Sequence, residues 1–294
     1  MEAELQPHFS EALGLYLKKH RGKDAKFAAD VSRVFDSAKS VIGDPALASI
    51  KRADARRVLD SMLSKNLKTA SVKRNLAVLS AIFNVAILEL ELQIKNPFSS
   101  LEIPGLLEDA RTIPSFTDAE LHQIAEAGLD EKSDASLIAT MQIELGARVS
   151  EIALLRVTDI HLTEPIPYIE IKEHREFGRR LKTPGSARAL PLLGCSLAAA
   201  QLAMKTTSGN GWLFERGRRN ASIMTNRWLS RTLGGKRRSH SSRHSMESRL
   251  ILARTDQRLT DTILGHKTGG IGSVYFSGYA LSDLAAALSR IALN

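Results

Sequence analysis

The chain has 294 residues, enough for about two domains of ordinary size, and its 43% apolar content excludes a disordered protein. Lys and Arg number 41 against 32 Asp and Glu, and this excess is typical of proteins that bind polyanions. The single cysteine, Cys195, excludes an intrachain disulfide and a multi-cysteine zinc site, and indicates a buried thiol in a reducing cytoplasm. No apolar run approaches the ~20 residues that cross a bilayer, so we expect no membrane partner.

The first hundred residues predict a helical domain. Apolar residues recur at three- and four-residue steps between Phe9 and Leu90, most clearly from Thr69 onward. This pattern must end before Asn96-Pro97, because the residue ahead of a proline avoids helical dihedral angles. We assign residues 1–99 to this domain and residues 100–113 to a linker, because the stretch from Asn96 to Pro114 holds Asn-Pro, Ser-Ser, Pro-Gly and a further Pro.

Basic side chains of this domain could grip a DNA backbone, although scattered solvated charge explains them equally well. They are Lys51, Arg52, Arg56, Arg57, Lys65, Lys68, Lys73 and Arg74.

Residues 114–294 predict a second domain, mainly helical with a small sheet. It begins with a capping box, Thr117-Asp-Ala-Glu120, in which a hydroxyl and a carboxylate three residues apart satisfy free amides at a helix start. Short strands are expected at Tyr168–Lys172 and Arg188–Pro191, with hairpin-turn chemistry in the segment that begins at Lys182. A lysine at this turn could reach into a DNA groove and protonate a leaving oxygen, but, taken alone, Lys182 is better explained as an exposed turn residue.

The segment from Ser239 to Tyr279 carries chemistry suited to a phosphodiester. It contains His240-Ser-Ser-Arg243-His244, then Leu264-Gly265-His266, and then Tyr275. An arginine offers a planar fork that matches two phosphate oxygens, a histidine transfers protons near neutral pH, and a tyrosine hydroxyl can be a covalent nucleophile. Between Arg216 and Arg254, eleven Lys or Arg residues accompany a single acid, Glu247, which favours a phosphate-lined partner.

Each of these residues has a simpler interpretation. His240 and His244 have the spacing of a zinc pair, but position 241 is Ser instead of the acid that such motifs carry, and Arg243 would repel a divalent cation. His266 could be a helix-cap residue, and Tyr275 and Tyr279 could be amphipathic core residues. Arg148, which follows the glycine turn at Gly146, could be a surface arginine.

The order of the motifs resembles that of the tyrosine recombinase family, also called phage integrases. The matching segments are Gly146-Ala147-Arg148-Val149-Ser150-Glu151, Lys182-Thr183, His240-Ser241-Ser242-Arg243-His244, Leu264-Gly265-His266 and Tyr275. The resemblance covers nearly the whole chain and implies a two-domain DNA clamp, with residues 1–99 as the core-binding domain and residues 114–294 as the catalytic domain. No cofactor and no metal are implied.

The resemblance also implies roles for individual residues. Arg148 and Arg243 would bind the scissile phosphate, and Tyr275 would form the 3′-phosphotyrosyl link. Lys182 would be the general acid toward the leaving 5′ oxygen, although Arg179 and Arg180 just before it leave the identity of that cation open. The remaining assignments are His240 as proton acceptor or donor, His266 as a phosphate-contacting hydrogen bonder, Glu151 as a buttress for the histidines, and Tyr279 as a backup nucleophile if the loop register slips.

The expected function is a site-specific recombinase that integrates or excises a mobile element. Its expected partners are double-stranded DNA at a core recombination site, three further copies in a homotetramer, and accessory DNA-bending or directionality factors. The apolar tail from Leu281 to Leu293 could pack on a neighbouring copy or on its own domain. Two alternatives remain open: a catalytically idle DNA-binding relative and a type IB topoisomerase.

Overall fold

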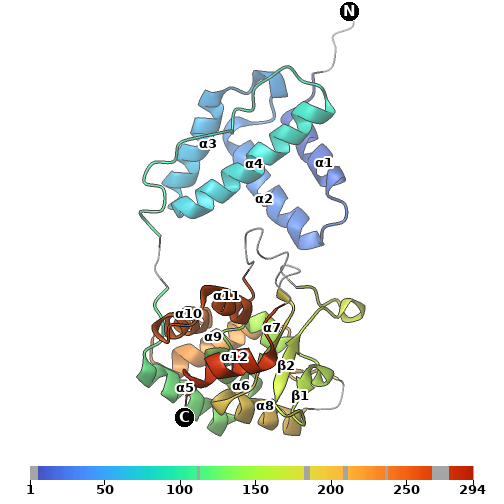
Figure 1. The fold of residues 1–294 in the computed structure, drawn as a ribbon. Coiled ribbons are helices and arrows are strands. Elements are labelled where there is room, and N and C mark those ends of the chain that lie inside the picture. The colour runs from blue at the N-terminus through green and yellow to red at the C-terminus, as the bar shows by residue number, and fades with distance from the viewer. Residues whose placement is uncertain are drawn as a thin grey trace, which may run out of the picture. The chain divides into compact units, whose positions relative to one another are not determined.

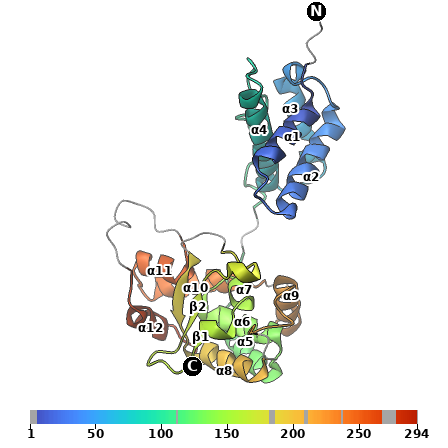
Figure 2. The same cartoon turned by 90° about the vertical axis from the view of Figure 1, so that its right-hand side faces the viewer.

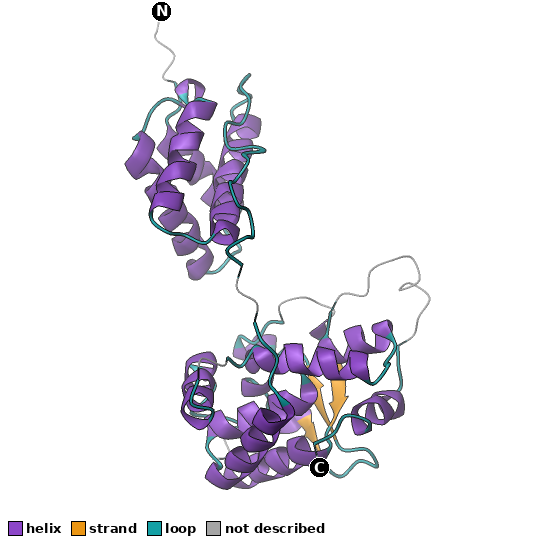
Figure 3. Cartoon of the chain, turned by 90° about the vertical axis from the view of Figure 1, so that its left-hand side faces the viewer, coloured by secondary structure: helices purple, strands orange, loops and turns teal. Residues whose placement is uncertain are grey.

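The computed structural model describes residues 6–110, 113–181, 186–207, 211–235, 238–266 and 278–293. The chain forms two compact units, unit 1 from Met1 to Thr112 and unit 2 from Ile113 to Asn294 (Figures 1 and 2). Helices dominate both units, and the strands of the described residues form one sheet in unit 2 (Figure 3). The predicted fold class, mainly α with a small β-sheet, is confirmed.

The described part of unit 1 is a bundle of four α-helices. They are α1 (Phe9–Lys19), α2 (Ala25–Ile42), α3 (Arg52–Ser64) and α4 (Thr69–Glu89), with a 3-10 turn η1 (Leu47–Ser49) between α2 and α3. Aromatic rings from three helices meet in the core: the Phe9 ring centroid lies 4.3 Å from that of Phe35 and 5.7 Å from that of Phe83. Such tilted ring pairs add to the stabilisation that area burial supplies.

The segment after α4 packs on unit 1. The amide nitrogen Nδ2 of Asn96 donates to the carbonyl oxygen of Ser80 at 2.8 Å. Farther along, the carboxylate of Asp109 accepts from the backbone amide of Thr69 at 3.0 Å and from its hydroxyl at 2.5 Å. Asp109, within the stretch 100–113 that composition indicates as a linker, is therefore bonded to the start of α4.

Helix α4 is, by length and composition alone, apolar enough to cross a membrane. Core helices of folded domains pass the same test. Here Leu76, Leu79, Ile82, Phe83 and Ala86 of α4 are buried in the core of unit 1. The structure thus accounts for the apolar face of α4 without a bilayer.

Unit 2 combines helices with a short sheet. Its helices are α5 (Asp118–Glu131), α6 (Asp134–Leu145), α7 (Val149–Ala153), α8 (Gly194–Thr206), α9 (Ala221–Thr232), α10 (Ser241–Leu252), α11 (Gln257–Leu264) and α12 (Leu281–Ser289). Its strands are β1 (Ile160–His161), β2 (Tyr168–Ile171) and β3 (Arg188–Pro191), and its 3-10 turns are η2 (Val157–Asp159) and η3 (Arg175–Phe177).

Helix α6 is the centre of unit 2. Every residue from Ala135 to Leu145 is buried, as expected of a helix that is covered on all sides. Helices α5, α8, α9 and α10 pack against it. The predicted capping box starts α5, where the amide of Glu120 donates to the Thr117 hydroxyl at 3.2 Å.

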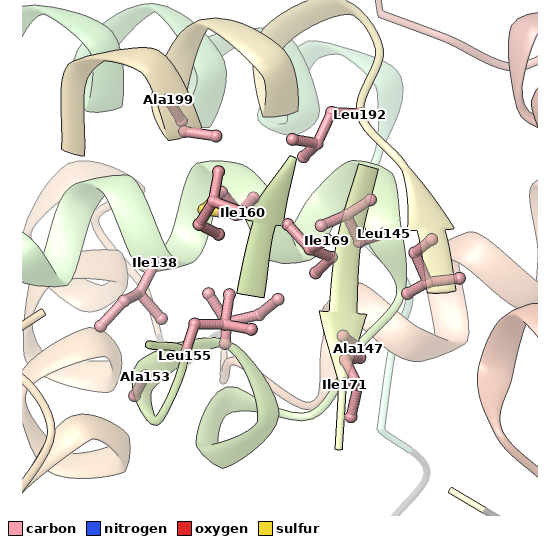
Figure 4. Packing of buried hydrophobic residues seen from close by; sticks show 14 of the residues in the cluster. Ile138, Leu145, Ala147, Ala153, Leu155, Ile160, Ile169, Ile171, Leu192 and Ala199 are labelled. Atoms are coloured by element: carbon pink, nitrogen blue, oxygen red, sulfur yellow. The ribbon is translucent and has the colours of Figure 1, made fainter. Parts of the chain in front are cut away.

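The sheet is antiparallel, in the order β1-β2-β3. Its register pairs Ile160 with Ile169, and Ile169 in turn with Leu190. Ile169, Ile171 and Leu190 are buried, and Figure 4 shows the sheet's apolar side chains packed together with those of α6 and α8. The sheet and the central helix therefore share one core.

The C-terminal helix α12 packs on its own unit. Leu284, Ala287 and Leu288 are buried in the core that contains α6 and the sheet. Beyond α12, the backbone amide of Leu293 donates to Glu144 Oε1 at 2.7 Å. The sequence allows this tail to pack on a neighbouring copy or on its own domain. In the structure, the tail packs on the core of its own unit.

Candidate active site

Arg148 projects from a tight turn between α6 and α7. Gly146 ends α6 with φ +58°, a left-handed conformation that favours glycine. A Cβ atom at Gly146 would lie 2.6 Å from Met246 Cγ of α10 and 2.9 Å from Leu264 Cδ2 of α11. The turn that carries Arg148 is thus packed directly against the two helices that carry the later motifs.

Arg243 lies in α10 and is almost fully buried, at 6% exposure. Its Nη1 donates to the carbonyl oxygen of Gly146 at 2.9 Å. Burial lowers the pKa of Arg243 to about 10, and the positive charges of Arg148 and Arg188 act in the same direction. The guanidinium remains charged at neutral pH and lacks a carboxylate partner among the ion pairs of the described residues, so it is poised for an anion.

Arg148 shares a carboxylate with a second arginine. Its backbone amide donates to Glu151 Oε2 at 2.9 Å, and its Nη1 forms a short ion pair with Glu151 Oε1. Arg188 of β3 donates from Nη2 to Glu151 Oε2 at 3.0 Å. Burial alone would raise the pKa of Glu151, but Arg188 and Arg148 outweigh it and hold that pKa below its usual value.

The histidines lie at helix ends beside these arginines. His240 is the N-cap residue of α10, and its ring meets that of His244 edge-on, with centroids 5.1 Å apart. His266 follows Gly265, which ends α11 with φ +63°. The His266 Nδ1 atom lies 3.5 Å from Asp261 Oδ1.

One open pocket of about 230 Å³ collects these side chains. It is lined by Arg148, His240, Arg243, His244, Glu247, Leu264 and His266. Four of the six residues singled out from the sequence therefore face the same space, although they come from three separate segments of the chain. Two guanidiniums and three imidazoles around one pocket suit a phosphate group.

The other two, Lys182 and Tyr275, lie outside the described residues. Tyr279, the backup nucleophile, is described: its hydroxyl donates to Asp256 Oδ1 at 2.9 Å. Partial burial and this hydrogen bond raise the pKa of Tyr279.

Two expectations need correction. Glu151 was expected to buttress the histidines, but its carboxylate bonds Arg148 and Arg188. Arg179 was a second candidate for the general acid, yet its side chain is buried and its Nη1 donates to Asp159 Oδ2 at 2.9 Å. Arg179 thus supports the hairpin and is unavailable to protonate a leaving group.

Sequence reasoning did not assign three residues of this region to the site. His244 and Glu247 line the pocket one helical turn after His240 and Arg243, so helical spacing alone could have found them. Arg188 gives no such signal, because nothing near it in the sequence indicates that a strand arginine is buried. Within the described residues, no group of three or more His, Cys, Asp or Glu side chains is arranged to hold a metal ion.

Comparison with known proteins decides the family. The sequence model of the phage integrase family matches residues 115–280, more than half of the chain. The chain belongs to the phage integrase family. It is therefore a tyrosine recombinase, an enzyme that cleaves and rejoins DNA strands through a covalent phosphotyrosyl intermediate.

Curated relatives of this recombinase carry the same designation. A tyrosine recombinase of Thermosipho africanus is 25% identical over 77% of this chain and 80% of its own length. Tyrosine recombinase XerC of Haemophilus ducreyi is 25% identical over 75% of this chain and 72% of its own.

Solved integrases share the fold of the recombinase. The Tn1549 transposon integrase, in complex with a circular intermediate DNA, matches with a TM-score of 0.71 and 19% identity, over 96% of this chain and 99% of that one. A lambda integrase tetramer bound to a Holliday junction matches with a TM-score of 0.69 and 18% identity, over 92% of this chain and 78% of that one.

Proposed function

We propose that the pocket lined by Arg148 and Arg243 holds the scissile phosphate of a core recombination site. Two fixed guanidiniums would stabilise the charge that builds on the phosphorane, which is usually the largest catalytic contribution. The proposal is supported by the pocket's lining and by the burial of Arg243 without a carboxylate ion pair among the described residues.

In the proposed reaction, the Tyr275 hydroxyl oxygen attacks phosphorus. The bond between phosphorus and the 5′ oxygen breaks, and a 3′-phosphotyrosyl bond forms. His240 accepts the proton that the Tyr275 hydroxyl loses, and Lys182 delivers a proton to the leaving 5′ oxygen. His266 adds a hydrogen bond to a phosphate oxygen.

The reaction exchanges one phosphoester for another. Uncatalysed hydrolysis of a phosphodiester is so slow that the site must lower the activation free energy by on the order of 15 to 20 kcal/mol. Because the phosphotyrosyl bond stores the energy of the broken bond, a 5′ hydroxyl of another strand can attack it and rejoin the DNA without ATP.

Unit 1 is the proposed core-binding domain, and its proposed DNA contacts lie on and around α3 and at the start of α4. The eight basic residues named from the sequence are all exposed and fall at the N-cap of α3, on α3, on the α3–α4 connection and on the first turns of α4. Arg57 pairs with Asp54, and Lys68 lies 3.8 Å from Asp109. Lys73 and Arg74 are exposed on α4 and are the proposed backbone contacts.

Exchange between two duplexes needs several active sites at once, so we propose a homotetramer on DNA. Lambda integrase, which shares the fold, is a tetramer on a Holliday junction and a dimer on a core site. Integration or excision of a mobile element, accessory DNA-bending or directionality factors and action in the cytoplasm remain part of this proposal.

The test is single-turnover cleavage of a nicked suicide DNA whose core sequence is first selected by binding from a randomised pool. Arg148→Ala and Arg243→Ala should each slow formation of the covalent adduct by about 100- to 1,000-fold while DNA binding remains close to that of the wild type. A wild-type chain that binds the selected DNA and forms no adduct would instead indicate the idle relative. Adduct rates unaffected by both substitutions would place the phosphate elsewhere.

A further inference from the structure

Arg188 lies at the junction of three segments that surround the pocket. Its side chain is 5% exposed, and all three of its nitrogens donate hydrogen bonds. Nη2 reaches Glu151 Oε2 at 3.0 Å, Nε reaches the carbonyl oxygen of Ile263 at 2.8 Å, and Nη1 reaches that of Ser186 at 2.9 Å. One guanidinium thus ties β3 to α7 and to the end of α11.

The side chain of Arg188 leaves no room for a side chain at position 265, the glycine that precedes His266. A Cβ atom at Gly265 would lie 2.5 Å from Nη1 of Arg188 and 2.9 Å from its Cζ. Because the Arg188 guanidinium occupies that space, the Leu264-Gly265-His266 turn closes directly over it. The close approach gives a physical reason for glycine at position 265 beyond its φ of +63°.

Arg188 sets the net charge of the group that it forms with Glu151 and Arg148. Glu151 is a buried carboxylate that pairs with Arg148 on one oxygen and with Arg188 on the other. Together the three groups carry one net positive charge. Without Arg188, the carboxylate would cancel the charge of Arg148, and of the two guanidiniums that line the pocket only that of Arg243 would keep an uncompensated charge.

We propose that Arg188 is a positioning residue that neutralises Glu151, so that Arg148 is held in place by the carboxylate and still presents its positive charge to the phosphate. This inference rests on the proposed phosphate-binding role of Arg148. Arg188 itself is absent from the residues that line the pocket, so it acts through Glu151 and Arg148.

A purely structural role makes a different prediction. If Arg188 served only to join three segments, its loss would weaken anion binding by displacing those segments, and removing the Glu151 charge as well would not restore the binding. If it acts through charge, removing Glu151 should compensate for removing Arg188. A double-mutant cycle separates the two cases.

The probe is inorganic sulfate, which mimics the phosphate and needs neither DNA nor cleavage. Its affinity for the full chain is measured from the arginine Nε–Hε resonances by NMR, with thermal unfolding of every variant measured alongside. Arg188→Met should bind sulfate about tenfold more weakly than the wild type. Glu151→Gln should bind it more tightly than the wild type, and Glu151→Gln combined with Arg188→Met should return to near the wild-type affinity.

Two further variants control for folding. Arg188→Lys keeps the charge while losing the fork, so it should keep an affinity near that of the wild type even if Arg188→Met fails to fold. Arg249→Met removes a half-buried arginine, whose guanidinium donates to the carbonyl oxygens of Ile143 and Ile291, and it should leave sulfate binding unchanged.

Cleavage supplies the second readout. Arg188→Met should slow adduct formation on the suicide DNA by about 100-fold, as small displacements of a phosphate-binding group do. Equal sulfate affinities for the wild type, Arg188→Lys and Glu151→Gln, or a double variant weaker than Arg188→Met, would overturn the inference. A wild-type chain that shows the predicted order of sulfate affinities and forms no adduct would overturn the proposed function while the inference stands.

Discussion

The guanidinium of Arg243 donates a 2.9 Å hydrogen bond to the carbonyl oxygen of Gly146. The residues are 97 positions apart, so this bond forms only when α10 has packed against the end of α6. It fixes Arg243 against the same turn from which Arg148 projects two residues later. The spacing of the two candidate phosphate ligands is therefore set by the packing of unit 2.

Gly146→Ala should disrupt this packing. The new Cβ would lie 2.6 Å from Met246 Cγ, at a φ of +58° that alanine rarely adopts. Strain and overpacking together should lower the free energy of unfolding by about 2 to 4 kcal/mol. Urea unfolding followed by tryptophan fluorescence measures the change in unit 2, because both tryptophans, Trp212 and Trp228, lie there.

The matched control is Gly178→Ala. Gly178 has a similar φ of +72°, but an added Cβ would have no heavy atom within 4 Å. Gly178→Ala should therefore lower the free energy of unfolding only by the backbone strain, about 1 to 2 kcal/mol. Equal losses for both variants would contradict the close approach of Met246 to the turn.

Asp159→Asn should destabilise unit 2 strongly. Asp159 is fully buried and accepts from Arg179 Nη1 at 2.9 Å, while His174 Nε2 lies 2.8 Å from its Oδ1. Loss of the charge leaves Arg179 buried and unbalanced, at a cost of about 3 to 5 kcal/mol measured by the same fluorescence assay. Glu173→Gln, which breaks the solvated pair with Arg175, should change the unfolding free energy little.

The stability of unit 2 should depend on pH through Glu151. Its folded-state pKa lies below the ordinary value of 4.5, so between the two values the unfolded state binds more protons. The stabilisation by Glu151 is therefore complete above pH 4.5 and is lost as pH falls through the lower, folded-state pKa. Unfolding free energies measured across this range should fall less steeply for Glu151→Gln; parallel curves would show that Glu151 is not held ionised by the arginines.

DNA binding should depend on salt through unit 1. If Lys73 and Arg74 contact phosphates, the double alanine variant should reduce the slope of log affinity against log salt concentration by about two, since each contact contributes about one. Fluorescence anisotropy with a labelled duplex measures the slope. Lys18→Ala with Lys19→Ala removes the same charge from α1 and should leave the slope unchanged, whereas equal effects would indicate general charge attraction.

Much of the fold follows from local sequence patterns. The 3.6-residue periodicity of Thr69–Leu90 predicts α4, and the Thr117 capping box predicts the start of α5 to the residue. Strand β1, two residues long, has no detectable alternation, so it could not be predicted. The bonds of Asp109 to Thr69 also escape prediction, because they join turn residues to a helix start 40 positions away.

The site was predictable where its residues follow chain-local rules. Gly146 and Gly265 mark helix ends, which indicates where Arg148 and His266 emerge. The pairing of Arg188 with Glu151 was not predictable, because the two residues are 37 positions apart and their side chains meet only in the folded unit. Charge alone does not distinguish a buried strand arginine from an exposed one.

The identity of the tyrosine that carries DNA after cleavage tests the account most directly. The adduct formed on the suicide DNA is digested with nuclease and protease, and mass spectrometry locates the nucleotide on a peptide. A nucleotide is expected on Tyr275 in the wild type, and Tyr275→Phe should form no adduct while it retains DNA binding. A nucleotide on Tyr279, or an adduct that survives in Tyr275→Phe, would contradict this expectation.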